Sequence, residues 1–264
     1  MKKALSYTLI FLGIQLIASG LVVIVLKIIN NQTIASSPYV NIGTMALFSI
    51  ITAILFVARK WTEVSRSYLQ SKPRMAIMWS VLAAFGAVVP SMALQEQLPE
   101  LPNIVEAEME SIMNAHGGYF VIALLAPLTE EIVFRGAVLR ALLKWKPNNH
   151  WAMIAISALL FALIHMNPAQ MPHAFIIGLL LGWMFYRTDS IVPGVAFHWA
   201  NNTIAFILFK LYPNEETHLI DILGTQRNVA AAVLFSLLIL VPAIYQLHLW
   251  MKRPKTSSFS TILE

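Results

Sequence analysis

Two adjacent glutamates, Glu130 and Glu131, lie in the middle of an apolar stretch and are followed by Arg135. A carboxylate in hydrocarbon costs on the order of 3 kcal/mol on insertion scales, so a chain that keeps two there uses them. On a helix Glu131 and Arg135 are four residues apart and share a face, and we expect an ion pair between them. Glu130 is rotated by about 100° from Glu131 and lacks that partner. A carboxylate without a paired cation is suited to act as a general base.

His165 follows Phe161 by four residues in the next apolar stretch. A histidine in an apolar helix is more often a satisfied core residue than a functional one. The loop between the two stretches centres near Pro147, and Glu130 precedes this point by about as many residues as His165 follows it. In an antiparallel helical hairpin the two side chains would reach the same depth. We therefore expect Glu130 and His165 to share a site.

His198 and Asn202 are four residues apart on a further apolar helix, so both side chains could aim at one point. The alternative is a pair that forms hydrogen bonds between helices, which membrane helices do use. Gly178 and Gly182 lie on the preceding helix, where the spacing of small residues permits close helix packing.

Together these residues supply a carboxylate, two imidazoles and a carboxamide. Glu130 would take a proton from water, His165 would hold the same water, and His198 and Asn202 would donate hydrogen bonds to a carbonyl oxygen as it gains charge. The expected reaction is hydrolysis of an amide without a covalent intermediate. No serine or threonine lies in a nucleophile-elbow context, and no HExxH zinc motif occurs.

A metal is the open alternative, because Glu130, His165 and His198 could together ligate zinc. Asn202 is a poor zinc ligand and a good hydrogen-bond donor to an oxyanion. The residues therefore favour a metal-free site without a cofactor.

The composition indicates the elements that must position these groups. Of 264 residues, 58% are hydrophobic and only 12% are charged, whereas soluble domains carry roughly 25% charged residues. The absence of cysteine excludes a disulfide framework, a thiolate nucleophile and a cysteine-ligated metal. No basic patch with interleaved aromatic residues indicates nucleic-acid binding. We predict an all-α polytopic membrane helix bundle, embedded in the lipid bilayer.

A membrane span needs about 20 predominantly apolar residues, and about eight transmembrane helices are predicted. They form a single integral membrane domain over residues 1–264, with the active site within the bundle. The expected spans are Ala4–Ile29, Val40–Ala58, Met75–Leu94, Gly118–Leu143, Trp151–Met166, Met171–Tyr186, Ile191–Leu211 and Val229–Trp250. Residues 189–194, with Pro193 and Gly194, are typical of the start of the seventh helix.

Loop charges predict the orientation. Basic residues concentrate before the first span and after the second, fourth, sixth and eighth: Lys2, Lys3, Arg59, Lys60, Arg66, Lys72, Arg74, Lys144, Lys146, Arg187, Lys252, Arg253 and Lys255. The other loops carry the acidic residues Glu96, Glu100, Glu106, Glu108, Glu110, Glu215, Glu216 and Asp221. By the positive-inside rule both termini are cytoplasmic, which agrees with an even number of spans.

This topology places two histidines of the expected site at different depths in the membrane. His198 lies near the cytoplasmic start of the seventh span, whereas His165 lies near the outer end of the fifth. Either the fourth and fifth helices protrude into the cytoplasm or the fifth span stops short. We favour protrusion because four basic residues are awkward in lipid: Arg135, Arg140, Lys144 and Lys146.

An amphipathic helix is expected over Asn103–Ala115, with an apolar stripe formed by Val105, Met109, Ile112 and Met113. The simpler interpretation is a helix that lies in the membrane interface on the outer face. The alternative is a lid that gates substrate access.

Three motifs occur in order on successive membrane helices: Glu130-Glu131-x3-Arg135, Phe161-x3-His165 and His198-x3-Asn202. On these motifs the segment of about residues 118–211 resembles the CPBP (Abi) family of intramembrane endopeptidases. That family includes the type II CAAX prenyl proteases and bacterial relatives linked to bacteriocin maturation and self-immunity. The resemblance implies catalytic roles for Glu130, His165, His198 and Asn202, with Glu131, Arg135 and Phe161 in support.

The expected function is therefore that of an intramembrane endopeptidase in a bacterial cell (inner) membrane, of the glutamic type, with a metalloprotease as the alternative. The compact length and short loops resemble bacterial members of the family, so peptide precursors or membrane-protein tails are expected as substrates rather than prenylated CAAX proteins, which are a eukaryotic substrate class. A catalytically idle binding protein, acting in bacteriocin self-immunity or as a sensor scaffold, is the runner-up. A transporter or proton channel is a third hypothesis, because glutamate and histidine also build proton relays. No inverted repeat or pair of broken helices indicates one.

Overall fold

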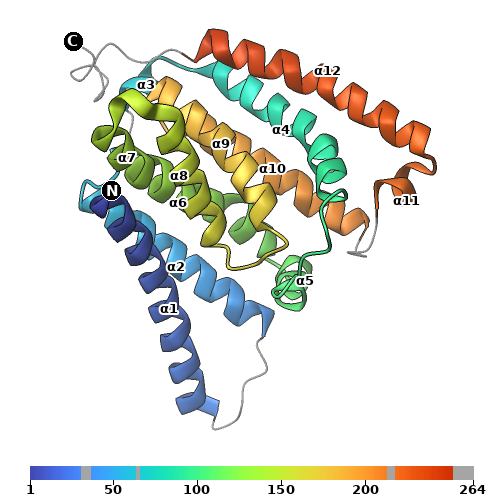
Figure 1. The fold of residues 1–264 in the computed structure, drawn as a ribbon. Coiled ribbons are helices and arrows are strands. Elements are labelled where there is room, and N and C mark those ends of the chain that lie inside the picture. Colours follow the sequence, from blue (N-terminus) through green and yellow to red (C-terminus); the bar gives the residue numbers. More distant parts are fainter. Residues whose placement is uncertain (31–36, 64–65, 213–217, 252–264) are drawn as a thin grey trace.

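The computed structural model describes residues 1–30, 37–63, 66–212 and 218–251, and no strand occurs among them. The expected all-α bundle is confirmed (Figure 1). The elements are α1 (Lys2–Asn30), α2 (Pro38–Ala58), α3 (Arg66–Gln70), α4 (Arg74–Gln95), α5 (Glu106–Asn114), η1 (Phe120–Leu125), α6 (Ala126–Glu130), η2 (Glu131–Leu139), α7 (Arg140–Trp145), η3 (Pro147–Asn149), α8 (His150–Leu163), α9 (Met171–Thr188), α10 (Val192–Leu211), α11 (Leu219–Leu223) and α12 (Gln226–Trp250).

Each of the eight expected spans corresponds to helix in the described part of the chain. The fourth is the run from η1 through α7, in which the residues that join the four elements all keep right-handed helical backbone angles. Among the described residues, α1, α2, α4 and α12 are long and apolar enough to cross a bilayer. Their outward faces carry large apolar side chains such as Leu238, which is 69% exposed. Contact with lipid tails accounts for such surfaces.

The length of α8 bears on the different membrane depths that the sequence predicts for His165 and His198. It has 14 residues, which span about 21 Å, whereas a bilayer core is about 30 Å thick. Leu163 ends the helix, and His165 lies in the turn that follows it. A fifth helix of this length agrees with a span that stops short, and the protrusion that we favour from the sequence stays a prediction. Arg135 and Arg140, whose charges were the argument for protrusion, both have carboxylate partners inside the protein.

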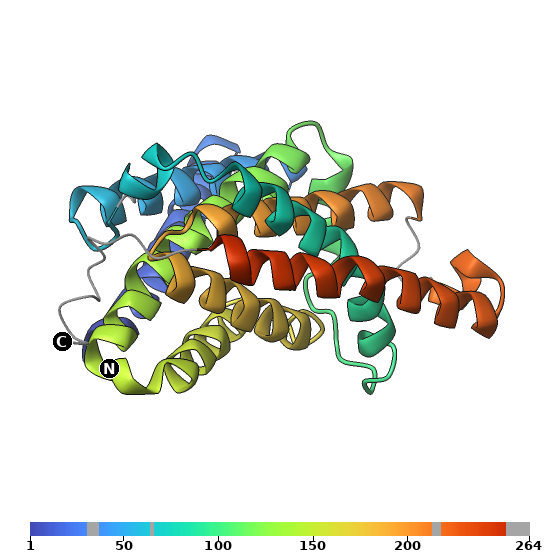
Figure 2. The same cartoon turned by 90° about the horizontal axis from the view of Figure 1, so that it is seen from above.

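Helices α1, α2, α8, α9 and α10 pack against the run from η1 to α7. In Figures 1 and 2, α4 lies beside α12, and α4 also packs on α10. Helices α8 and α9 form a close pair. A Cβ atom added at Gly178 would lie 2.9 Å from the Cβ of Ala158, and one added at Gly182 would lie 2.8 Å from a methyl of Ile154. The predicted close packing at these two glycines is confirmed.

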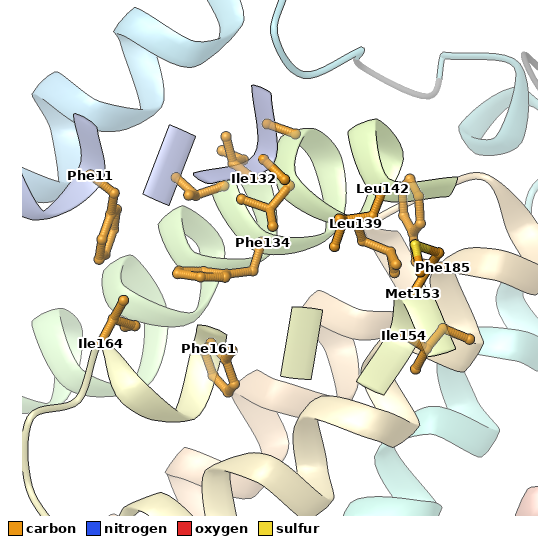
Figure 3. Close-up of a cluster of buried hydrophobic side chains, with 14 of the residues drawn as sticks. Phe11, Ile132, Phe134, Leu139, Leu142, Met153, Ile154, Phe161, Ile164 and Phe185 are labelled. Carbon is orange, nitrogen blue, oxygen red and sulfur yellow. The ribbon is translucent and has the colours of Figure 1, made fainter. Parts of the chain in front are cut away.

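A core of aromatic and aliphatic side chains joins α1, η2 and α8 (Figure 3). The ring of Phe134 meets Phe11 edge-on at 5.6 Å and Phe161 edge-on at 5.4 Å, measured between ring centroids. Edge-on aromatic pairs of this kind contribute about 0.5–1.5 kcal/mol beyond the area that they bury. Phe161 is thereby fixed at the inner side of the core, next to the candidate site residues.

Polar contacts join several helix ends at one end of the bundle. The hydroxyl of Thr62, after α2, donates to the carbonyl of Ile132 at 2.6 Å. The buried guanidinium of Arg140 pairs with Asp189, after α9, at 3.0 Å and with Glu63 at 3.3 Å. Arg187 donates to the carbonyl of His248 in α12 at 2.7 Å. These contacts gather loops that the sequence assigns to the cytoplasm.

The assignment of that end to the cytoplasm stays a prediction. Five charged residues used for it, Glu215, Glu216, Lys252, Arg253 and Lys255, lie outside the described residues.

The contact between η2 and the end of α2 leads to a prediction. A methyl group at Gly136 would overlap the side chain of Thr62, which donates to the Ile132 carbonyl. We expect Gly136→Ala to lower the free energy of unfolding by about 1–3 kcal/mol, the usual cost of overpacking. Gly13→Ala in α1 is the control, because nothing lies within 4 Å of its added Cβ. Removing a helix-interior glycine there should stabilise the protein by about 0.5–1 kcal/mol. Thermal unfolding in detergent measures both, and equal midpoints would contradict the packing described here.

Candidate active site

The helix that carries Glu130 has π-helical segments on both sides of this residue. Glu130 is the last residue of α6, with η1 before it and η2 after it. Such segments frequently occur at functional sites, because the wider turn redirects side chains and leaves carbonyls open to outside donors. Here Thr62 donates to the Ile132 carbonyl at 2.6 Å and Ser157 donates to the Phe134 carbonyl at 3.2 Å. Thr62, which follows α2, and Ser157 in α8 thus stabilise the π-helical form of η2.

Glu131 and Arg135 form the ion pair that their spacing predicts. The Oε1 atom of Glu131 lies 2.8 Å from a terminal nitrogen of Arg135, and both side chains are buried. The other terminal nitrogen of Arg135 donates to the Gly178 carbonyl at 3.4 Å, and the guanidinium stacks 4.3 Å from the ring centroid of Phe161. The pair therefore joins η2 to α8 and α9.

His198 lies between the two glutamates. Its Nδ1 is 3.2 Å from Oε1 of Glu131, and its Nε2 is 3.6 Å from Oε2 of Glu130. The first distance is that of a hydrogen bond, whereas the second is longer than a direct one. Helix α10 packs against α6 and so brings His198 close to Glu130. Glu130 does lack a contact with Arg135, as predicted.

Gly194 allows α10 to approach this closely. A Cβ atom at this position would lie 2.6 Å from Oε2 of Glu131. From the sequence we interpreted Pro193 and Gly194 only as a helix start, and α10 does begin at Val192. Gly194 lies one turn before His198 and therefore on the same face of α10. This spacing is the signal in the sequence that could have identified Gly194 as part of the site.

Phe161 organises both histidines. Its ring meets the ring of His165 edge-on at 5.0 Å and that of His198 at 5.8 Å. The Nδ1–H group of His165 donates to the Phe161 carbonyl at 2.8 Å. Because a carbonyl only accepts, this contact leaves Nε2 of a neutral His165 with its lone pair free.

Glu130 and His165 line the same cavity, as the hairpin argument predicted. The cavity has a volume of about 690 Å³ and extends between α1, α2 and α5. His198 lies behind Glu130 and does not line it.

Asn202 does not share a target with His198 in this structure. Its side-chain amide donates to the Ile122 carbonyl of η1 at 3.0 Å and accepts from Asn201 at 3.3 Å. The packing of α10 on η1 sets this orientation, which the four-residue spacing alone could not show.

Helix α5 begins at Glu106, three residues later than expected, and three of the four residues of the expected apolar stripe face the cavity, whereas Met113 does not. Val105, Met109 and Ile112 belong to the cavity lining. Asn167, which follows His165 by two residues, accepts from the backbone of Ile104 at 3.1 Å and donates to Asn103 at 2.8 Å. The start of α5 is thus tied to the turn that carries His165.

The zinc alternative requires Glu130, His165 and His198 to converge on one point. Within the described ranges no three His, Asp or Glu side chains are grouped so that they could hold a metal ion. Glu130, His165 and His198 accordingly do not form a ready three-ligand set.

Residues 114–204 match the family model described as type II CAAX prenyl endopeptidase, Rce1-like. No curated protein and no solved structure matches the chain. The matched segment contains all three motifs and every residue of the site, from Glu130 to Asn202. The family model indicates CAAX-type protease activity. The long apolar helices indicate an integral membrane protein. Residues 114–204 are therefore similar to the Rce1-like type II CAAX prenyl endopeptidases, which agrees with the resemblance of this segment to the CPBP family.

Proposed function

We propose that the protein is an intramembrane endopeptidase that hydrolyses a peptide bond with water activated by Glu130. The observation that carries this proposal is the separation of the two glutamates. Glu131 is buried and paired with Arg135, whereas Glu130 lines a large cavity together with His165. One carboxylate thus serves the structure, and the other is open to water and substrate.

In the proposed mechanism Glu130 removes a proton from water, which attacks the peptide carbonyl and forms a tetrahedral intermediate. His165 holds the same water. Its Nδ1–H donates to the Phe161 carbonyl, so Nε2 is the atom that can accept a hydrogen bond from the water. Glu130 then carries the proton that the leaving amine needs.

In the proposed mechanism His198 and Asn202 stabilise the negative charge on the carbonyl oxygen, which requires both side chains to turn toward the substrate from the orientations that they have in this structure. Because Nδ1 of His198 donates to Glu131, donation from Nε2 to an oxyanion requires the doubly protonated ring. With that ring, two carboxylates would face two cations, Arg135 and His198, which balances the charge of a buried site. Asn202 uses one amide hydrogen on Ile122, and the second is left for the oxyanion.

The proposed reaction uses no metal and no other cofactor. As substrates we propose peptide precursors or membrane-protein tails. The lining by α1, α2 and α5 extends well beyond the reacting groups, which suits a polypeptide segment rather than a single small molecule. We further propose a bacterial cell (inner) membrane as the location, with both termini on the cytoplasmic side.

The role of Glu130 is tested by Glu130→Gln, which keeps the shape of the side chain and cannot accept the proton. We expect at least a ~100-fold loss of proteolysis, the scale of general-base catalysis, with normal protein yield. Comparing the membrane proteomes of cells with the wild type and the variant identifies uncut substrates, and a peptide that spans the cut site then gives rates. Glu110→Gln is the control, because Glu110 is exposed on α5 and outside the cavity lining. Near-normal cleavage by Glu130→Gln would refute the mechanism and favour the idle binding protein.

The structural role of Glu131 is tested by Glu131→Ala, which leaves Arg135 as an unpaired buried charge. Breaking one side of a buried pair typically costs ~3–5 kcal/mol, so the yield of folded protein in detergent should fall together with activity. Glu63→Ala removes a partner of Arg140 that is 55% exposed and should cost under about 1 kcal/mol. If Glu131→Ala and Glu130→Ala both leave the yield unchanged, the two glutamates do not divide their roles as proposed.

Asn202→Ala should lower turnover by roughly 10²–10³-fold, as loss of one oxyanion-hole donor does, with little change in substrate binding. Purified enzyme should also keep its activity after exhaustive chelation. The assay measures turnover with and without chelator, and elemental analysis measures the metal content. Stoichiometric zinc, with activity that is lost on removal and restored on return, would overturn the metal-free mechanism and make Glu130, His165 and His198 ligands.

A further inference from the structure

Main-chain groups of a substrate need hydrogen-bond partners when they lie in a membrane. Each backbone N–H or C=O group that stays unpaired in hydrocarbon destabilises the bound state. A helical substrate pairs these groups internally, whereas an extended segment around the reacting bond leaves them open. An endopeptidase that cuts within a bilayer therefore has to supply partners for the extended main chain.

Helix α1 carries its polar side chains on the face that lines the large cavity. It is one of the four helices that are long and apolar enough to cross a bilayer. Between residues 9 and 27 it has three polar side chains, Gln15, Ser19 and Lys27, and all three line the cavity. A polar group in hydrocarbon is costly unless it is paired, so a helix that faces only lipid does not carry such a row. The polar face of α1 indicates contact with a polar ligand in the cavity.

Gln15 is the polar side chain of this face that lies near the middle of α1, and it is half-buried. Within the described part of the chain its carboxamide forms no hydrogen bond. Gln15 lies one turn, or about 6 Å, beyond Phe11, whose ring contacts Phe134 beside the site. A carboxamide carries both donors and an acceptor, which match the C=O and N–H groups of an extended main chain.

A second half-buried carboxamide, that of Asn41, lines the cavity from α2 and also forms no hydrogen bond with the described residues. The Ser49 carbonyl accepts from Thr129, the residue before Glu130, and so marks the level of the site on α2. Asn41 lies eight residues from Ser49, which is about 12 Å along the helix. At about 3.3 Å per residue of extended chain, Gln15 and Asn41 are about two and about four residues from the reacting bond. Helices α1 and α2 separate toward the end of α1 in Figure 1, and the cavity extends between them.

We propose that Gln15 and Asn41 bind the main chain of an extended substrate segment on one side of the reacting bond. Each carboxamide donates to a substrate carbonyl and accepts from a substrate N–H group. Both are positioning residues, and they recognise the peptide backbone rather than particular side chains. The proposal rests on the endopeptidase function proposed above and names how that site holds its substrate.

Gln15→Leu tests this role with the substrate peptide that the comparison of membrane proteomes identifies. We expect KM to rise about 3–10-fold, the value of about one hydrogen bond, while kcat changes less than about twofold. The yield of folded protein should not fall, because the side chain has no partner within the described residues to lose. Gln246→Leu on α12 is the matched control, since Gln246 lies outside the cavity lining and accepts from Trp250.

A second peptide, with alanine at the positions two and four residues from the cut, separates backbone from side-chain recognition. Gln15→Leu should raise KM equally for both peptides, because their main chains are the same. A rise with only one of them would overturn the proposal. An unchanged KM in Gln15→Leu, together with loss of cleavage in Glu130→Gln, would also overturn it and would leave the endopeptidase function in place.

Binding of an extended chain can be measured without proteolysis in the Glu130→Gln background. The chain has no cysteine, so Ser19→Cys, one turn from Gln15 in the cavity wall, provides a single thiol. The probes are two synthetic apolar peptides of about 20 residues in lipid vesicles, each with one central cysteine. One of them is a regular helix, and the other carries a Gly-Pro pair beside the cysteine, which breaks the helix.

The disulfide with Ser19→Cys should form at least 10-fold faster for the broken helix, and adding Gln15→Leu should reduce this preference at least threefold. Leu238→Cys on α12, where the side chain is 69% exposed, is the lipid-facing control and should react alike with both peptides. Equal rates at Ser19→Cys, or a preference that Gln15→Leu leaves intact, would overturn the proposal. The expected preference together with normal cleavage by Glu130→Gln would refute the proposed catalysis and uphold the binding of an extended chain.

Discussion

The buried pair of Glu131 and Arg135 is the interaction around which the site is built. Removing two charges from water costs several kcal/mol per ion, and only good geometry with further contacts offsets this cost. The surrounding helices supply those contacts: the Phe161 ring from α8, the Gly178 carbonyl from α9 and His198 from α10. Each of these helices is held in place by the charge that it helps to satisfy. The same contacts set the position of His198 and, through Phe161, that of His165.

The architecture separates a polar centre from an apolar periphery. Helix α8 is too short to cross a bilayer, and the helix that carries Glu130 is widened into π-helical turns. The π-helical turns would not be stable against lipid, because open backbone carbonyls and buried charges need partners. The long helices α1, α2, α4 and α12 lie around this centre in Figures 1 and 2 and turn their apolar faces outward. The irregular elements are therefore confined to the place where the chemistry is proposed.

The spacing of residues along the sequence predicted the contacts that form within one helix or across one helical hairpin. The Glu131–Arg135 pair follows from helical periodicity, and the common cavity of Glu130 and His165 follows from equal distances to the hairpin turn. The orientations of His198 and Asn202 do not follow, because α10 meets α6 and η1 only through tertiary packing. The contact of Ser91 with His173 joins residues 82 positions apart, which one sequence does not reveal. The π-helical turns were also missed, since their apolar pattern is the same as that of an α-helix.

The size of the large cavity limits which polypeptides the proposed endopeptidase can cleave. A helix about 10 Å across fills roughly 420 Å³ per turn, so a space of about 690 Å³ holds less than two turns. An intact transmembrane helix of about 20 residues has more than five turns and does not fit. Only a segment that has unwound, or that never formed a helix, can reach Glu130. Stable helical neighbours in the same membrane, and the helices of the protein itself, are then protected by their own backbone hydrogen bonds.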